Sequence, residues 1–210
     1  MIKICKNKTL NQKRVDTFDR QVKTLCDLGY PEAVGIERCE FIPYVSPLRG
    51  KFEIGDLIVI PKRFITLHKQ MLMTKVNNKA GYAIFNLNLL LDDDVTPRMP
   101  YLIRDVDDGA ATIGISFKSC VEDFNKQKRF GLSAEEGNAL IIHSPEVLNH
   151  HFINLLGTNY QYGQNRILCL WLEGGHPCLS CSWFDYGTAE WEANPKVKWG
   201  FASCGSRILG

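Results

Sequence analysis

Between residues 15 and 28, apolar side chains recur every three or four positions, and charged side chains fill positions between them. This spacing places the apolar side chains on one face of an α-helix. Gly29 follows where a glycine commonly ends a helix, and Pro31 prevents simple continuation. The pattern therefore predicts an amphipathic helix over residues 15–28 and a second, short helix over about residues 36–45.

Between residues 56 and 106, the pattern changes to short runs of β-branched and aromatic residues, which favour strands. Proline and glycine bound these runs, and the Asn77-Asn78 pair followed by Gly81 indicates a turn. We expect strands over residues 56–60, 64–76, 81–85 and 101–106.

Helical spacing returns near the middle of the chain, over residues 117–124. Ser133 and Glu136 then match a capping box, in which each side chain bonds the backbone N–H of the other residue. This motif predicts a helix that starts after Ser133 and ends near Ser144-Pro145. Beyond residue 165, short strands are expected over residues 167–172, 179–184 and 198–202.

Helices and strands follow one another without the regular alternation of a parallel α/β protein, so the sequence predicts an α+β fold. We expect a single domain over residues 15–210, in which N-terminal and central helices pack on a mixed or antiparallel sheet. Its C-terminal strand region is rich in Trp and Cys. Residues 1–14 carry five basic and no acidic side chains, and we expect them to form a basic N-terminal arm.

Composition excludes several classes of protein. Of the 210 residues, 45% are hydrophobic, which is too many for an intrinsically disordered chain. The net charge of +2 gives no general reason to expect nucleic acid or a membrane as a partner, so we expect a small molecule or another protein. No apolar run is long enough to span a membrane, and the first residues lack the features of a signal peptide. We therefore expect a cytoplasmic protein with reduced cysteines.

Four of the eight cysteines and all four tryptophans lie beyond residue 165. The segment from His176 to Cys181 contains a Cys-x-x-Cys step, which can give zinc two thiolate ligands. If this segment is a strand, however, Cys178 and Cys181 point to opposite faces because their separation is odd. Buried free thiols are the other interpretation. We predict no cofactor and keep zinc as a weaker alternative, with His176, Cys178, Cys181 and Cys204 as candidate ligands.

Cys204 is a candidate nucleophile because small residues surround it and Arg207 could lower the pKa of its thiol. Such chemistry also needs a base, for which His143 is the first choice. His150, His151 and His176 are further candidates, and no motif links any of the four to Cys204. The other interpretation of this segment is a glycine turn that carries a structural thiol.

The segment from Asp105 to Gly109 shares part of the aspartate pattern of calcium loops. It lacks the spacing and the final Glu of such a loop, so a turn after a strand is favoured. The candidate ligand-binding residues are Asp105, Cys181, Trp183, Trp199, Ser203 and Arg207.

Several blocks of the sequence together resemble a bacterial domain family of unknown function. The most distinctive block is Trp-Gly-Phe-Ala-Ser-Cys-Gly-Ser-Arg at residues 199–207. The blocks span nearly the whole chain, so the resemblance implies a single domain. It names no substrate, but it implies that Cys181, Trp199 and Cys204 are neighbours in one site. The other blocks are residues 18–22, 28–30, 101–109, 132–137, 143–148, 170–172 and 181–183.

Three functions remain open from the sequence. We favour a ligand- or protein-binding domain that uses the C-terminal region, because clustered aromatic residues suit a recognition surface and no catalytic set meets its spacing requirement. The alternative is a cysteine-dependent hydrolase or transferase with Cys204 as the nucleophile. A zinc-stabilised module is the third possibility.

Overall fold

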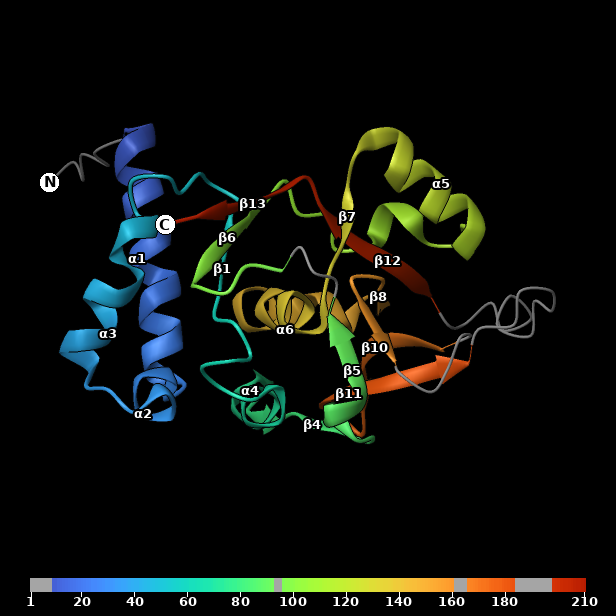
Figure 1. Cartoon of the computed structure of the whole chain (residues 1–210), viewed down its shortest axis with the longest axis horizontal. Helices are drawn as coiled ribbons and strands as arrows, with labels where there is room; N and C mark the ends of the chain where they lie inside the picture. The colour runs from blue at the N-terminus through green and yellow to red at the C-terminus, as the bar shows by residue number, and fades with distance from the viewer. Residues whose placement is uncertain (1–8, 93–95, 161–165, 184–197) are drawn as a thin grey trace, which may run out of the picture.

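The computed structural model describes residues 9–92, 96–160, 166–183 and 198–210 and confirms an α+β fold. The N-terminal part of the chain forms three helices, which lie at one side of the molecule (Figure 1). Thr9 caps the first helix by accepting a hydrogen bond from the backbone N–H of Gln12, so this helix begins at Leu10 rather than at residue 15. Gly29 follows its end with φ +84°, as predicted. The helices are α1 (Leu10–Asp27), α2 (Tyr30–Val34) and α3 (Arg38–Val45).

A small antiparallel sheet lies next to these helices. It has the order β1 (Leu57–Val59), β6 (Tyr101–Arg104) and β13 (Ser206–Leu209). Phe18 and Leu25 of α1 share one buried cluster with Ile58 of β1 and Leu102 of β6. One face of the small sheet is therefore covered by the N-terminal helices.

A larger, mixed sheet has the order β4-β11-β10-β8-β12-β7. β4 runs parallel to β11, and β12 runs parallel to β8, whereas the other pairs are antiparallel. The strands β10 and β11 form a hairpin around Gly174-Gly175, both with positive φ. The strands are β4 (Tyr82–Ala83), β7 (Phe130–Gly131), β8 (Phe152–Leu155), β10 (Arg166–Glu173), β11 (His176–Trp183) and β12 (Trp199–Cys204).

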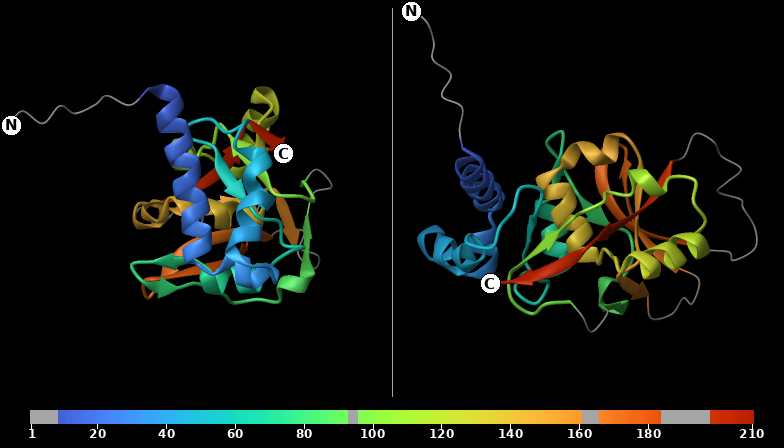
Figure 2. Two further views of the ribbon diagram at one scale, coloured as in Figure 1. Left: turned by 90° about the vertical axis from the view of Figure 1, so that its left-hand side faces the viewer. Right: turned by 90° about the horizontal axis from the view of Figure 1, so that it is seen from above.

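The helix α6 (Ala134–His143) lies at the centre of the molecule, between the N-terminal helices and the large sheet (Figures 1 and 2). Its predicted capping box is confirmed: Ser133 Oγ accepts from the N–H of Glu136, and Glu136 Oε2 accepts from the N–H of Ser133. Leu140 and Ile141 pack in the cluster of the large sheet, and Ile142 packs in that of the N-terminal helices. α6 therefore joins the two cores.

The prediction of a strand over residues 64–76 is wrong for most of its length, because residues 67–73 form a helix, α4 (Leu67–Met73). Thr66 caps this helix, and Leu67, Gln70 and Met71 bury its inner face. Strands predicted near the Asn77-Asn78 turn are confirmed only as short pieces, β2 (Lys75–Val76) and β3 (Lys79–Ala80).

The remaining elements are short helices and strands, and η marks a 3-10 helix. They are η1 (Ser46–Leu48), η2 (Leu87–Leu89), β5 (Leu90–Asp92), η3 (Ala110–Thr112), α5 (Phe117–Gln127), η4 (Pro145–Asn149) and β9 (Thr158–Tyr160).

Two glycines allow the turn after β6 to touch the start of β12. A Cβ atom added to Gly200 would lie 2.0 Å from the carbonyl oxygen of Gly109, and one added to Gly109 would lie 2.8 Å from the carbonyl carbon of Gly200. Gly109 also has φ +99°, which favours glycine. This backbone contact fixes the position of the turn against the large sheet.

Within the described ranges, none of the helices is both long and apolar enough to cross a bilayer. Residues 1–8 of the predicted basic arm lie outside the described part of the chain, as does Phe184 of the predicted strand 179–184.

Candidate functional site

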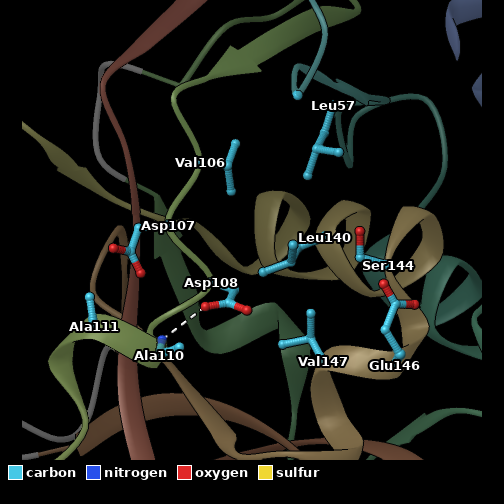
Figure 3. Close-up of a pocket in the computed structure, with 11 residues that line it drawn as sticks. Leu57, Val106, Asp107, Asp108, Ala110, Ala111, Leu140, Ser144, Glu146 and Val147 are labelled. Atoms are coloured by element: carbon cyan, nitrogen blue, oxygen red, sulfur yellow. Dashed lines mark hydrogen bonds between the residues drawn. The ribbon is translucent and has the colours of Figure 1, made fainter.

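A pocket of about 510 Å³ opens between the turn after β6 and the C-terminal end of α6 (Figure 3). Its volume lies within the range of small-molecule sites, roughly 300–1,000 Å³. Ala110, Ala111 and Glu146 are exposed at the pocket. The lining residues are Gly55, Leu57, Val106, Asp107, Asp108, Ala110, Ala111, Leu140, Ser144, Glu146 and Val147.

The turn after β6 forms one wall of the pocket and carries two carboxylates. Asp107 exchanges two backbone hydrogen bonds of 2.9 Å with Ser203 of β12. Oδ1 of Asp107 accepts from the N–H of Gly109 at 2.8 Å, and Oδ1 of Asp108 accepts from the N–H of Ala110 at 2.9 Å. The backbone therefore holds both carboxylates in place, and neither of these bonds uses the second carboxylate oxygen.

The end of α6 and the start of η4 form the opposite wall. The N–H of Ser144 makes the last bond of α6, to the carbonyl of Leu140, and Pro145 then starts η4. Glu146 follows on the first turn of η4 and is exposed. Within the described part of the chain, the Glu146 carboxylate has no ion-pair or hydrogen-bond partner. It is therefore available to a ligand.

His151 connects the two walls. It follows η4, is 5% exposed, and donates from Nε2 to the backbone carbonyl of Asp108 at 3.0 Å. The same nitrogen lies 3.9 Å from Oδ1 of Asp108. A side chain from the η4 wall thus holds the turn that forms the other wall, so the pocket is preformed.

The lining combines acidic and apolar groups. Asp107, Asp108 and Glu146 bring three carboxylates, and none of the lining residues, all of which are described, is basic. The apolar part comes from Leu57, Val106, Leu140 and Val147. Such a surface favours a cation that also carries an apolar part.

A metal site is not what brings these carboxylates together. Among the described residues, no group of three or more His, Cys, Asp or Glu side chains is arranged to hold a metal ion. This holds for the pocket and for the zinc candidates. β11 carries Cys178 and Cys181, whereas β12 carries Cys204. Two strands separate β11 from β12, so their backbones lie about 14 Å apart at the usual strand spacing.

The same topology corrects the expectation that Cys181, Trp199 and Cys204 are neighbours in one site, because β10 and β8 separate Cys181 from the other two. Trp199 instead packs with Phe152 and Trp171, at ring-centroid distances of 4.8 and 5.8 Å. His176 makes a hydrogen bond from Nδ1 to the carbonyl of Ala80 at 2.9 Å. The side chain of Trp183 lies outside the described residues.

Cys204, the candidate nucleophile, is fully buried on β12. Burial is the main cause that raises the pKa of its thiol to about 12, and the carboxylate of Glu136 acts in the same direction. Arg207 and Arg129 act in the opposite direction. The guanidinium of Arg207 is already bound to Glu136, at 2.5 Å from Nε and 2.9 Å from a terminal nitrogen, and that of Arg129 is bound to Asp105.

His143 lies at the far end of α6 from Glu136, about 10 Å along the helix axis. Its Nε2 bonds the carbonyl of Ile58 at 3.2 Å. Burial lowers the pKa of His143 to about 4, the bond to Ile58 opposes this shift, and the charge of Arg20 adds to it. His143 therefore belongs to the packing of α6 against β1, and the structure does not pair it with Cys204.

Two other predicted residues do meet, through a third that sequence reasoning missed. Arg129 donates from Nε to Ser203 Oγ at 2.8 Å and from a terminal nitrogen to Asp105 Oδ2 at 2.5 Å. Asp105 has a left-handed backbone (φ +54°) that ends β6. These contacts fasten the base of the turn that carries Asp107 and Asp108.

Sequence reasoning also missed the pocket itself. The sequence pattern predicts Asp107 and Asp108 only as part of a turn and Ser144 only as part of a helix end. The available signal was that acidic residues follow both a strand end and a helix end. Nothing in the local pattern shows that these two ends meet.

Comparisons with known proteins identify a family only. No curated protein matches the chain significantly, and neither does any solved structure. A family of unknown function, DUF5701, matches residues 24–210, which include both walls of the pocket and its support on β12. The chain therefore belongs to the family of unknown function DUF5701.

Proposed function

We propose that the protein is a binding protein whose small-molecule ligand occupies the pocket between the turn after β6 and the end of α6. The observation that carries this proposal is the preformed pocket, which combines an apolar lining with three carboxylates. Protein sites for small molecules commonly pair such an apolar lining with a few placed polar groups.

In this proposal, the C-terminal region supports the wall of the pocket that carries Asp107 and Asp108. Ser203 holds Asp107 through the backbone, and Gly200 allows the turn to pack against β12. Arg129 fastens Ser203 to the same turn. The distinctive C-terminal block thus shapes the pocket from behind, while the groups that touch a ligand come from the turn and from α6 and η4.

A substitution that fills the pocket tests the proposal. Ala111 is exposed in the pocket lining, so Ala111→Trp should fill the pocket with an indole ring and leave the core intact. We expect a panel of small amines, amino acids, sugars and nucleotides to contain compounds that raise the thermal midpoint of the unmodified protein. The affinity of these compounds, measured by titration calorimetry, should fall at least tenfold in the variant.

Ala80→Trp provides the matched control, because Ala80 is exposed on β3, like Ala111, and lies outside the pocket. It should leave the affinity unchanged if it folds, which circular dichroism checks. The proposal is contradicted if no compound of the panel raises the midpoint, or if the compounds bind Ala111→Trp as tightly as the unmodified protein.

A further inference from the structure

We infer that the pocket binds a linear diamine or polyamine, with one ammonium group at the Asp107–Asp108 end and another at Glu146. This inference rests on the proposed function, because it assigns the ligand class of the same pocket. It adds that the ligand has at least two positive charges separated by a methylene chain.

The first support is the distribution of charge within the pocket. Asp107 and Asp108 lie on one side, and Glu146 lies on the other, with Leu140 and Val147 between them (Figure 3). The order along the pocket is thus acidic, apolar, acidic. A methylene chain can cover the apolar residues while an ammonium group at each end meets a carboxylate.

The second support is that the carboxylates do not converge. A divalent metal ion needs several oxygen ligands at about 2–2.6 Å. The described residues hold no group of three acidic or other metal-ligating side chains placed in this way. Negative charge that is spread along a cavity of about 510 Å³ matches a ligand whose positive charge is also spread.

The third support is that the acceptors are ready and that none of the lining residues is basic; His151, which lies 3.9 Å from Oδ1 of Asp108, is not part of the lining. One oxygen of each aspartate is fixed by a backbone N–H of the turn, which orients the other oxygen. Among the described residues, Glu146 has no ion-pair or hydrogen-bond partner. An ammonium group has three N–H donors and no acceptor, so it can donate a charged hydrogen bond to each carboxylate oxygen that it meets.

The lining carries three carboxylates and no basic residue, and a ligand with two or three positive charges neutralises both ends of the pocket. A monoamine neutralises only one end of the pocket. We therefore expect 1,4-diaminobutane and spermidine to bind more tightly than n-butylamine, which has the same four-carbon chain as the diamine but one charge.

Titration calorimetry at low ionic strength with these three amines tests the inference. The diamine should bind the unmodified protein at least tenfold more tightly than n-butylamine. Glu146→Gln keeps the shape of the side chain and removes its charge, so it should bring the affinity for the diamine to within about threefold of that for n-butylamine. Asp108→Asn should also weaken diamine binding, because it removes a negative charge. Its amide oxygen can still accept from the N–H of Ala110, so the turn should keep its shape.

Asp123→Asn is the control, because Asp123 is an acid on α5 outside the pocket, and its side chain is half-buried. This variant should bind all three amines like the unmodified protein. Equal affinity for the diamine and n-butylamine, or a diamine affinity that Glu146→Gln leaves unchanged, would overturn the inference. So would a lysine-rich peptide that binds more tightly than spermidine, because it would make the partner a protein.

The two proposals fail in different ways. If no amine binds but another compound of the panel binds in a manner that Ala111→Trp abolishes, the diamine is wrong and the binding pocket stands. If the diamine binds Ala111→Trp as tightly as the unmodified protein, the site lies elsewhere and both proposals are overturned.

Discussion

The carboxylate of Glu136 is fully buried, and several neighbours donate hydrogen bonds to it. Arg207 donates two bonds, the N–H of Ser133 donates a third, and the hydroxyl of Tyr101 lies 3.0 Å from Oε1. A buried charge is tolerated only with such partners, and removing one of them commonly costs about 3–5 kcal/mol. At the scale of single residues, the role of Arg207 is therefore to pair with the buried carboxylate of Glu136. This role explains why Arg207 lies next to the buried Cys204.

The pH dependence of stability follows from His143. Its pKa in the folded protein is about 4, below the value of about 6.5 in an unfolded chain. Between these values the unfolded chain binds the extra proton, so the free energy of unfolding decreases as the pH is lowered through this range. We expect a loss on the order of 2 kcal/mol between pH 7 and pH 4.5 that is absent in His143→Gln.

Urea denaturation at a series of pH values measures this difference. His68→Gln is the control, since His68 is exposed on α4 and should leave the pH dependence unchanged. If His143→Gln loses stability with acid as steeply as the unmodified protein, burial of His143 does not disfavour its charged form.

At the scale of elements, the contact between the turn after β6 and β12 depends on two glycines. In Gly200→Ala, the new methyl group would overlap the carbonyl of Gly109 at a distance of 2.0 Å, so the backbone must move. We expect this substitution to lower the free energy of unfolding by about 2–3 kcal/mol, as overpacked sites do. Urea denaturation followed by circular dichroism measures the loss.

Gly50→Ala is the matched control for this substitution. A Cβ atom at Gly50 meets no atom within 4 Å, and no positive φ is found there. It should change the free energy of unfolding by no more than about 0.5 kcal/mol. Equal effects of the two substitutions would mean that the Gly109–Gly200 contact does not constrain the turn.

Elements were predictable from sequence where a local signal fixes them. The capping box at Ser133 and Glu136 is such a signal, and so is Gly29 after the first helix. The strand prediction over residues 64–76 is wrong because the β-branched and aromatic residues there favour a strand, whereas the cap at Thr66 starts a helix. The pocket could not be predicted, since its carboxylates at Asp108 and Glu146 lie in two turns that only the tertiary structure brings together.

At the scale of the whole molecule, the N-terminal helices and the two sheets form connected cores rather than separate domains. The family match starts at residue 24, within α1, but earlier residues of this helix are part of the fold. Phe18 and Val22 are buried, and Gln21 bonds the backbone of both Asp56 and Ile58 at the start of the small sheet.

Deletion of residues 1–23 should therefore destabilise the protein strongly. Loss of a single buried Phe typically costs about 3–5 kcal/mol, and this deletion removes further contacts as well. We expect a lower urea midpoint or a loss of cooperative unfolding. Tryptophan fluorescence measures both. Phe18→Ala in the full chain should give a smaller shift in the same direction. A truncated chain with an unchanged midpoint would show that this part of α1 is dispensable.

The position of β13 has a consequence for how the chain reaches this structure. β13 completes the small sheet by pairing with β6, which lies about a hundred positions earlier in the sequence. Closing so long a loop costs chain entropy before the new contacts compensate for it. Until that closure, β6 presents an open strand edge to other copies of the chain. Refolding at high protein concentration therefore sets this slow closure in competition with aggregation.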